Sequence, residues 1–372
     1  MSEKPKNEAP GEIKFSYGGQ AVIEGVLMRG ANDFAVAVRD PEGQIKVHKE
    51  PLNKYLYRGF VARTPFLRGI VGLWDAMGLG TKALMWSADV ALAEDGEEES
   101  VFGGAVGFVT VAVSLLIGVG LFFFLPTLAS TAIGGWLGLT TSDVEPIVEE
   151  VGTNDASSDV VEVEGEETTE TQRAFIFYEA LPIGWQATLI NLIENLIQLA
   201  MLVGYIWLIS QMEDVKRLFS YHGAEHKTIN AYEAGDELTP EIVSTYPIEH
   251  PRCGTAFLLT VVFVSVVVFS LLGRPPFLWL ILSRVVLIPV IAGISYEVLR
   301  WTAANLDKAW VRFIVTPNLM LQHLTTREPD LDMIEVAIVS FKHVLVSEGL
   351  LAEDENLIPE AKPEAAYAPG GD

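Results

Sequence analysis

Two short segments of the chain contain residue types that commonly bind metal ions. The first segment reads YHGAEHK and places His222, Glu225 and His226 at positions i, i+3 and i+4. On a helix these three side chains share one face, so both imidazoles can reach one Zn²⁺. The carboxylate beside them can then take a proton from a metal-bound water. The order His-x-x-Glu-His is that of the inverted zincins.

The second segment reads HPRCG and contains His250 and Cys253. Imidazole nitrogen and thiolate sulfur together suit a borderline-soft metal such as zinc. The expected ligand set is His222, His226, His250 and Cys253. Four protein ligands would make a closed, structural site, whereas three ligands and a water would make an open site with Glu225 as general base. The sequence leaves both arrangements open, as well as a third in which the histidines only form hydrogen bonds at a membrane surface.

Other polar residues are weaker candidates for a site. Glu233 follows His226 by about two helical turns and could be a further ligand, a partner that orients an imidazole, or a solvated acid. The isolated histidines His48, His323 and His343 are expected to be structural or exposed.

Four long apolar segments predict membrane-spanning helices. They cover about 103–125, 184–209, 255–272 and 277–299, and the first is expected to end at Pro126. Gly-Arg-Pro-Pro at 273–276 separates the third segment from the fourth, because two prolines cannot continue a helix. The chain is therefore expected to be a mainly α, polytopic membrane protein with four transmembrane helices at 103–300.

Charged residues lie inside two of these predicted spans. Glu194 belongs to a polar stripe of the second span, and Arg284 lies in the outer half of the fourth. A lone charge at this depth is costly, so we predict that the two side chains face each other within the bundle. Polar groups inside a membrane either belong to a functional site or hold neighbouring helices together by hydrogen bonds. The sequence alone does not distinguish these two roles.

The segments outside the spans have distinct compositions. Residues 13–50 predict a small β unit, since FAVAVRD and QIKVHKE flank a Pro-Glu-Gly turn. An amphipathic helix is expected near 334–345, with Asp332 and Glu335 as a capping box and its apolar face on the β unit. The remaining assignments are a disordered lead at 1–12, an interfacial helix and acidic linker at 51–102, a cytoplasmic C-terminal segment at 301–350 and a disordered acidic tail at 351–372.

The distribution of charge predicts the orientation of the chain. The formal net charge is −24, and eleven acidic residues lie between 142 and 172. Lysine and arginine gather instead in 53–82, in the loop 210–254 and after the fourth span. By the positive-inside rule, the acidic loop 126–181 is outside, and both termini and the histidine-rich loop are cytoplasmic, in a bacterial inner membrane. This acidic chain shows no basic face that would favour nucleic-acid binding.

Several longer motifs resemble a known bacterial family. They are YGGQAVIEGVLMRG at 17–30, TPFLRGI at 64–70, YHGAEHKTINAYE at 221–233, HPRCGTAF at 250–257, LTTREP at 324–329 and EVAIVSF at 335–341. Together they are similar to the YqhQ-like family of membrane proteins, a domain of unknown function labelled a predicted metal-dependent enzyme. The resemblance implies a membrane location and a metal, and it implies no particular substrate.

These observations support two main hypotheses about function. The first is a membrane-embedded zinc enzyme, a hydrolase with a cytoplasm-facing site in which Glu225 is the catalytic base. The second is a non-enzymatic membrane scaffold, in which a structural metal or histidine cluster fixes the loop and the cytoplasmic segments recruit a protein partner. A transporter with Glu194 and Arg284 along its path is a third, weaker reading, because the sequence shows no internal repeat.

Overall fold

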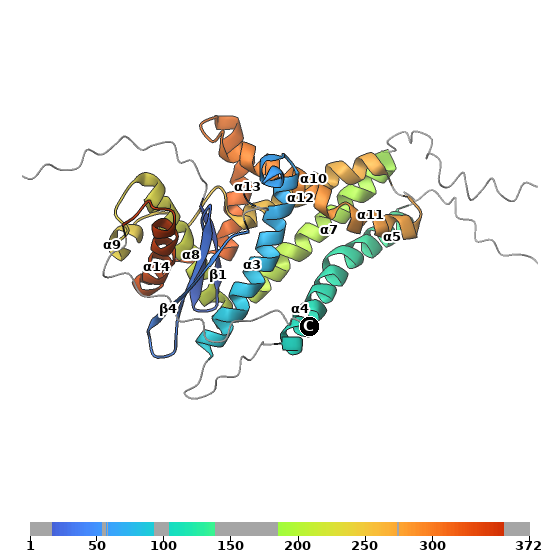
Figure 1. Cartoon of the computed structure of the whole chain (residues 1–372). Helices are drawn as coiled ribbons and strands as arrows, with labels where there is room; N and C mark the ends of the chain where they lie inside the picture. The colour runs from blue at the N-terminus through green and yellow to red at the C-terminus, as the bar shows by residue number, and fades with distance from the viewer. Residues whose placement is uncertain are drawn as a thin grey trace, which may run out of the picture.

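The protein consists of a helical bundle joined to a small β sheet (Figure 1). The structure is a computed structural model that describes residues 17–53, 57, 59–92, 104–137, 185–273 and 275–352. The predicted disordered lead, all but the first two residues of the predicted acidic tail, most of the acidic linker and most of the acidic loop lie outside these residues. The mainly α class predicted from the sequence is confirmed, and so is the N-terminal β unit.

The sheet is an antiparallel meander of four strands. The strands are β1 (Gly18–Val22), β2 (Gly25–Arg29), β3 (Asp33–Arg39) and β4 (Ile45–Pro51), in the order β1-β2-β3-β4. Because side chains alternate along a strand, Met28 and Ala37 enter one hydrophobic core while Leu27 and Val36 enter another. Both faces of the sheet are therefore covered by helices.

Helices α8 (Glu213–Ala234) and α14 (Leu331–Ser347) cover one face of the sheet, and α3 (Leu67–Ala91) covers the other. The amphipathic helix α14 packs on β2 and β3, as predicted. The predicted capping box is wrong, because the N-cap residue of α14 is Asp330 and Asp332 lies in its first turn. Glu335 instead forms an ion pair with Arg39 at 2.8 Å.

Three described helices are long and apolar enough to cross a membrane, or four if one bent pair counts as a span. The first runs through α4 (Gly104–Val119), a π-helical segment η1 (Gly120–Phe124) and α5 (Leu125–Trp136). The next two are α7 (Trp185–Ile209) and α10 (Gly254–Leu272). The bent pair is α11 (Phe277–Val286) and α12 (Ile288–Ala303), with 43° between them. The chain is thus a multi-pass membrane protein.

Two features of the helices differ from the sequence expectation. The first span does not end at Pro126, because the helix continues to Trp136. Pro126 lies in the first turn after the π-helical segment, where the missing backbone N–H costs least. The C-terminal segment also contains a further helix, α13 (Ala309–Thr325), which packs against α10 and α7. Two short helices, α2 (Phe60–Arg63) and α9 (Pro240–Val243), complete the described elements.

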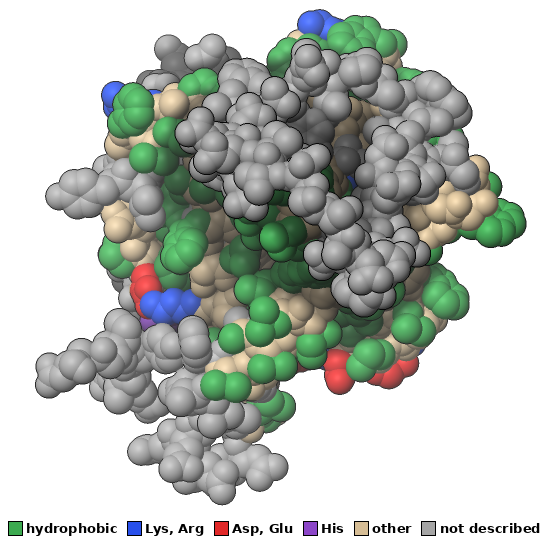
Figure 2. Space-filling model, turned by 90° about the vertical axis from the view of Figure 1, so that its right-hand side faces the viewer, with side chains coloured by type: hydrophobic (Ala, Val, Ile, Leu, Met, Phe, Trp, Pro, Cys, Tyr) green, Lys and Arg blue, Asp and Glu red, His purple; other side chains and the backbone are tan. Residues whose placement is uncertain are grey.

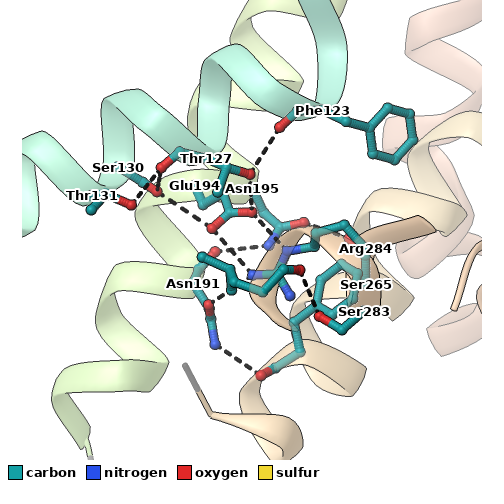
Figure 3. A network of polar contacts seen from close by, with 12 residues as sticks. Phe123, Thr127, Ser130, Thr131, Asn191, Glu194, Asn195, Ser265, Ser283 and Arg284 are labelled. Carbon is teal, nitrogen blue, oxygen red and sulfur yellow. Dashed lines mark hydrogen bonds and ion pairs between the residues drawn. The ribbon is translucent and has the colours of Figure 1, made fainter. Parts of the chain in front are cut away.

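The charged pair inside the bundle lies as predicted (Figure 3). Arg284 Nε donates to Glu194 Oε1 at 2.9 Å, and the two residues are only 4 % and 5 % exposed. Thr127 and Ser130 of α5 also donate hydrogen bonds to the carboxylate. The guanidinium lies 3.6 Å from the centroid of the Phe269 ring. The pair therefore holds α5, α7, α10 and α11 together.

The outer surface of the bundle is apolar. Figure 2 views the molecule from the end where α5 and α11 lie in Figure 1, and its described side chains are mostly hydrophobic. Large exposed side chains of the spans include Leu116, Phe263 and Leu278. Apolar surface of this extent is what lipid-facing helices expose.

Candidate metal centre

Three of the predicted ligands converge at the end of α10 that is nearest the sheet. One nitrogen of His222, one nitrogen of His226 and the sulfur of Cys253 all lie within 4.8 Å of one another. His226 and Cys253 are buried, with 1 % and 6 % exposure, and His222 is half-buried. No ion is part of the structure, but these atoms offer two imidazole nitrogens and a thiol, a ligand set that suits zinc.

Both histidine rings are held by backbone carbonyl groups. His222 Nδ1 lies 2.8 Å from the carbonyl oxygen of Thr325, and His226 Nδ1 lies 2.5 Å from that of Ile248. A carbonyl oxygen only accepts hydrogen bonds, so each Nδ1 carries the proton and each Nε2 keeps its lone pair. Metal-binding histidines are commonly oriented in this way. His226 Nε2 is buried without a hydrogen-bond partner, so its lone pair is available to a metal ion.

The third ligand comes from the start of a membrane span. Cys253 is the N-cap residue of α10, and its sulfur accepts a hydrogen bond from the backbone N–H of Thr255 at 3.4 Å. The sulfur also lies 3.2 Å from His222 Nε2. The predicted meeting of the two segments, at the point where the chain returns to the membrane, is therefore present in the structure.

His250 lies beside this group and not within it. Its Nε2 is 3.4 Å from the Arg252 guanidinium and 3.8 Å from a Glu233 oxygen, while its ring centroid is 5.7 Å from that of His226. Burial lowers the pKa of His250, and the nearby carboxylate of Glu233 acts in the opposite direction. Glu233 in turn forms an ion pair with Arg252, so it supports the site from outside.

Glu225 is buried between α8 and the first strand. The backbone N–H of Gly19 donates a hydrogen bond to its carboxylate, and a side chain at Gly19 would come within 3.1 Å of Glu225. The Oε2 atom has no hydrogen-bond partner. Burial raises the pKa of Glu225 to about 7, against the opposing effects of His222 and the Gly19 N–H. The carboxylate is thus held against Gly19 of the first strand, and one of its oxygens makes no hydrogen bond.

The loop that carries the second segment is fixed to α8 and α13 by hydrogen bonds. Lys227 Nζ donates to the carbonyl oxygens of Ser244 and Tyr246. The side chain of Gln322 pairs with the backbone of His250 through two hydrogen bonds of 2.9 Å. Sequence reasoning did not single out Gln322, because a glutamine of α13 has no metal-ligand pattern. Its position in chain order, just before the LTTREP motif, is the only signal it offered.

The remaining histidines lie away from the candidate centre. His48 forms a contact with Glu50 at 2.8 Å on the sheet, and His323 pairs with Glu249 at 3.3 Å. His343 is buried in α14, on the sheet side of the molecule. None of the three belongs to the group of possible ligands found in the described part of the chain.

Comparison with known proteins places the chain in a family. The family model described as "Protein of unknown function (DUF1385)" matches residues 64–154 and 169–347. The chain belongs to the DUF1385 family. A relative, "Uncharacterized protein YqhQ" of Bacillus subtilis (strain 168), is 33 % identical over 347 residues, which cover 91 % of this chain and 95 % of that protein. No solved structure matches the chain.

The candidate centre falls entirely within the second DUF1385 segment. Residues 169–347 include the three converging ligands, Glu225 and Gln322. The first segment begins at Thr64, after the last strand, so the sheet itself lies ahead of the DUF1385 match. The DUF1385 match therefore covers the membrane helices and the histidine-cysteine group of this chain, and it leaves out the sheet.

Proposed function

We propose that this DUF1385 protein is a membrane-embedded metal-dependent hydrolase with its site on the cytoplasmic side of the bacterial inner membrane. His222, His226 and Cys253 hold a zinc ion, and Glu225 acts as the general base. The proposal rests on the hydrogen bonds that orient the imidazole rings of His222 and His226. Both Nδ1 atoms donate to carbonyl groups, which leaves both Nε2 lone pairs next to one thiol.

A zinc ion held by His222, His226 and Cys253 would supply Lewis acidity, which makes a water molecule in the site easier to deprotonate near neutral pH. Glu225 lies one helical turn from His222, and its buried Oε2 has no other partner, so it can accept that proton. His250, Glu233 and Arg252 stand outside this group and orient the segment that carries Cys253.

The cytoplasmic location rests on charge. The loop that carries the site contains Lys216, Arg217 and Lys227, whereas the loop 142–172 carries eleven acidic residues. A reduced thiol is the normal state of cysteine in the cytoplasm, as a zinc ligand requires. The same orientation places the sheet and α14 in the cytoplasm.

The alternative is a scaffold in which the metal only crosslinks the loop and the helices. One observation favours it: the ligands come from α8 and from the start of α10, and their burial leaves little room for a large substrate. In that case a fourth protein ligand, His250, closes the site, and the cytoplasmic surface recruits a protein partner.

Cobalt substitution separates these functions without a known substrate. Purified protein loaded with Co²⁺ is titrated with azide or acetohydroxamate, and its visible absorption is recorded. An open site predicts a saturable spectral change, because the added anion replaces a bound water. The Glu225→Gln variant should bind Co²⁺ equally well and still respond to the anion, since Glu225 is not a ligand. A spectrum of four-coordinate cobalt that does not respond to either anion would contradict the proposed hydrolase and support the scaffold.

A further inference from the structure

Helix α13 exposes an apolar stripe for which the metal centre gives no reason. Trp310, Phe313, Ile314 and Met320 are all exposed, and Phe313 has 80 % of its surface free. Their spacing of three, four and seven residues places them on one side of the helix. A soluble domain rarely exposes such a stripe, because contact between apolar side chains and water is unfavourable.

The rest of α13 divides into two further stripes. Val311, Val315 and Gln322 are buried and form the side that packs against α10 and α7. Arg312, Thr316 and His323 are exposed on another side. Successive residues of a helix are rotated by about 100° about its axis. The exposed surface of α13 is therefore divided lengthwise into an apolar stripe and a polar stripe. A helix with this division fits a boundary between lipid and water.

The position of α13 along α10 agrees with such a boundary. Asn318 Nδ2 donates to Thr260 Oγ1 at 3.3 Å, in the middle of α13. Thr260 is six residues into α10, which corresponds to a depth of about 9 Å from the end that carries Cys253. Both α13 and α3 run obliquely to α7 (Figure 1), and α13 is not among the described helices long and apolar enough to cross a membrane.

Aromatic and basic residues at the start of α13 match the chemistry of a lipid headgroup layer. The Trp310 ring contacts Trp301 of α12, with 5.5 Å between centroids. Tryptophan is enriched at membrane–water boundaries. Arg300 in the last turn of α12, Lys308 at the N-cap of α13 and Arg312 in its first turn are exposed and complement anionic headgroups.

We propose that α13 is an interfacial helix that lies in the leaflet bordering the candidate metal centre. Its apolar stripe contacts acyl chains, its polar stripe faces headgroups and water, and its basic start binds anionic lipid. This placement does not depend on whether a metal is bound. It adds a membrane contact to the segment 301–350, which the sequence assigned to the cytoplasm as a whole. It also sets the metal centre, where Thr325 holds His222, at headgroup depth.

Spin labels on α13 test the proposal in the full-length protein. Phe313→Cys and Thr316→Cys place a label on the apolar and polar stripes, one turn apart, and both sites are exposed. The protein is reconstituted in nanodiscs of zwitterionic lipid with a fraction of anionic lipid. Collision rates with oxygen and with a water-soluble nickel chelate are then measured. The unsubstituted chain, in which Cys253 is buried, gives the background labelling.

The expected result is a contrast between the two labels. The label at position 313 should collide often with oxygen and rarely with nickel, and the label at 316 should show the reverse. Frequent nickel collisions at 313 would place the stripe in water, and low collision rates with both reagents would mean that a second copy or another protein covers it. Either of these results would overturn the proposal, as would a label at 316 protected from nickel as strongly as the one at 313.

Discussion

The sulfur of Cys253 lies 3.2 Å from Nε2 of His222, although the two residues are 31 positions apart and belong to different helices. The chain leaves the membrane after α7, folds α8 against the sheet, and returns at the start of α10. The site forms where these two passages meet. Its geometry depends on the loop, on the carbonyl groups that orient the rings, and on the contact of α8 with the end of α13.

The close approach of α8 to the end of α13 gives the first prediction. A Cβ atom at Gly223 would lie 2.1 Å from the carbonyl oxygen of Arg327, so Gly223→Ala must push these segments apart. We expect a loss of about 1–3 kcal/mol in stability and weaker metal binding. Thermal unfolding of the purified protein measures the first effect. Gly204→Ala is the matched control, because its Cβ would meet open space. Equal unfolding temperatures for both variants would show that the contact is not as close as described.

The intramembrane ion pair gives the second prediction. Glu194→Ala leaves the Arg284 charge buried without its partner and should cost roughly 3–5 kcal/mol. Glu194→Leu combined with Arg284→Leu removes both charges and should cost less than the sum of the single changes. Denaturant titration in detergent compares these variants with Leu192→Ala, which removes a more exposed side chain of the same helix. Additive losses would contradict direct pairing.

Gln322 gives a prediction about support of the site. Gln322→Met keeps the size of the side chain but removes both hydrogen bonds to the His250 backbone. Groups that orient metal ligands typically change affinity by about 10–100-fold, so we expect weaker zinc binding in this range. Competition with a chromophoric chelator measures the affinity. Gln211→Met, at an exposed position, is the control and should bind as the wild type does. An unchanged affinity in Gln322→Met would mean that the loop holds its shape without this contact.

The orientation in the membrane remains a prediction from charge. Cysteine placed at Glu237 should be protected from an impermeant maleimide in intact cells, and cysteine placed at Ser158 should react. Glu237 is exposed in the structure, so protection there would not come from burial. Labelling of the lysed cells confirms that both positions can react. Reaction at 237 with protection at 158 would reverse the topology.

Some parts of the architecture could be predicted from local sequence. Apolar length identified the helices at 185–209 and 254–272, and β-rich segments identified the hairpin of β3 and β4, because each pattern acts within a few residues. The pairing of Glu194 with Arg284 was also predicted, since a buried charge in a bilayer needs a partner. The predicted helix end at Pro126 was wrong, because the effect of this proline depends on the π-helical turn before it.

The arrangement of the site depended on contacts that local sequence does not reveal. The spacing of His222 and His226 predicts two converging rings, but the carbonyl groups of Thr325 and Ile248 that orient them come from distant segments. By local sequence alone, His250 looks as much like a metal ligand as the other three predicted residues do. It turns toward Glu233 and Arg252 because Gln322 fixes its backbone, and that contact spans 72 residues.

Metal content of the purified protein tests the central claim most directly. The wild type, purified without chelators or an affinity tag that binds metal, should contain about one zinc ion per chain by inductively coupled plasma mass spectrometry. His226→Ala and Cys253→Ala should each lose most of the metal, because each removes one of three ligands.

His250→Ala is the decisive companion variant. It should retain about one zinc ion per chain, because His250 lies outside the three-residue group. All variants are first checked for a wild-type elution volume, so that loss of metal is not confused with loss of fold. A wild-type protein without bound metal, or a Cys253→Ala variant that still contains about one zinc ion per chain, would contradict the account.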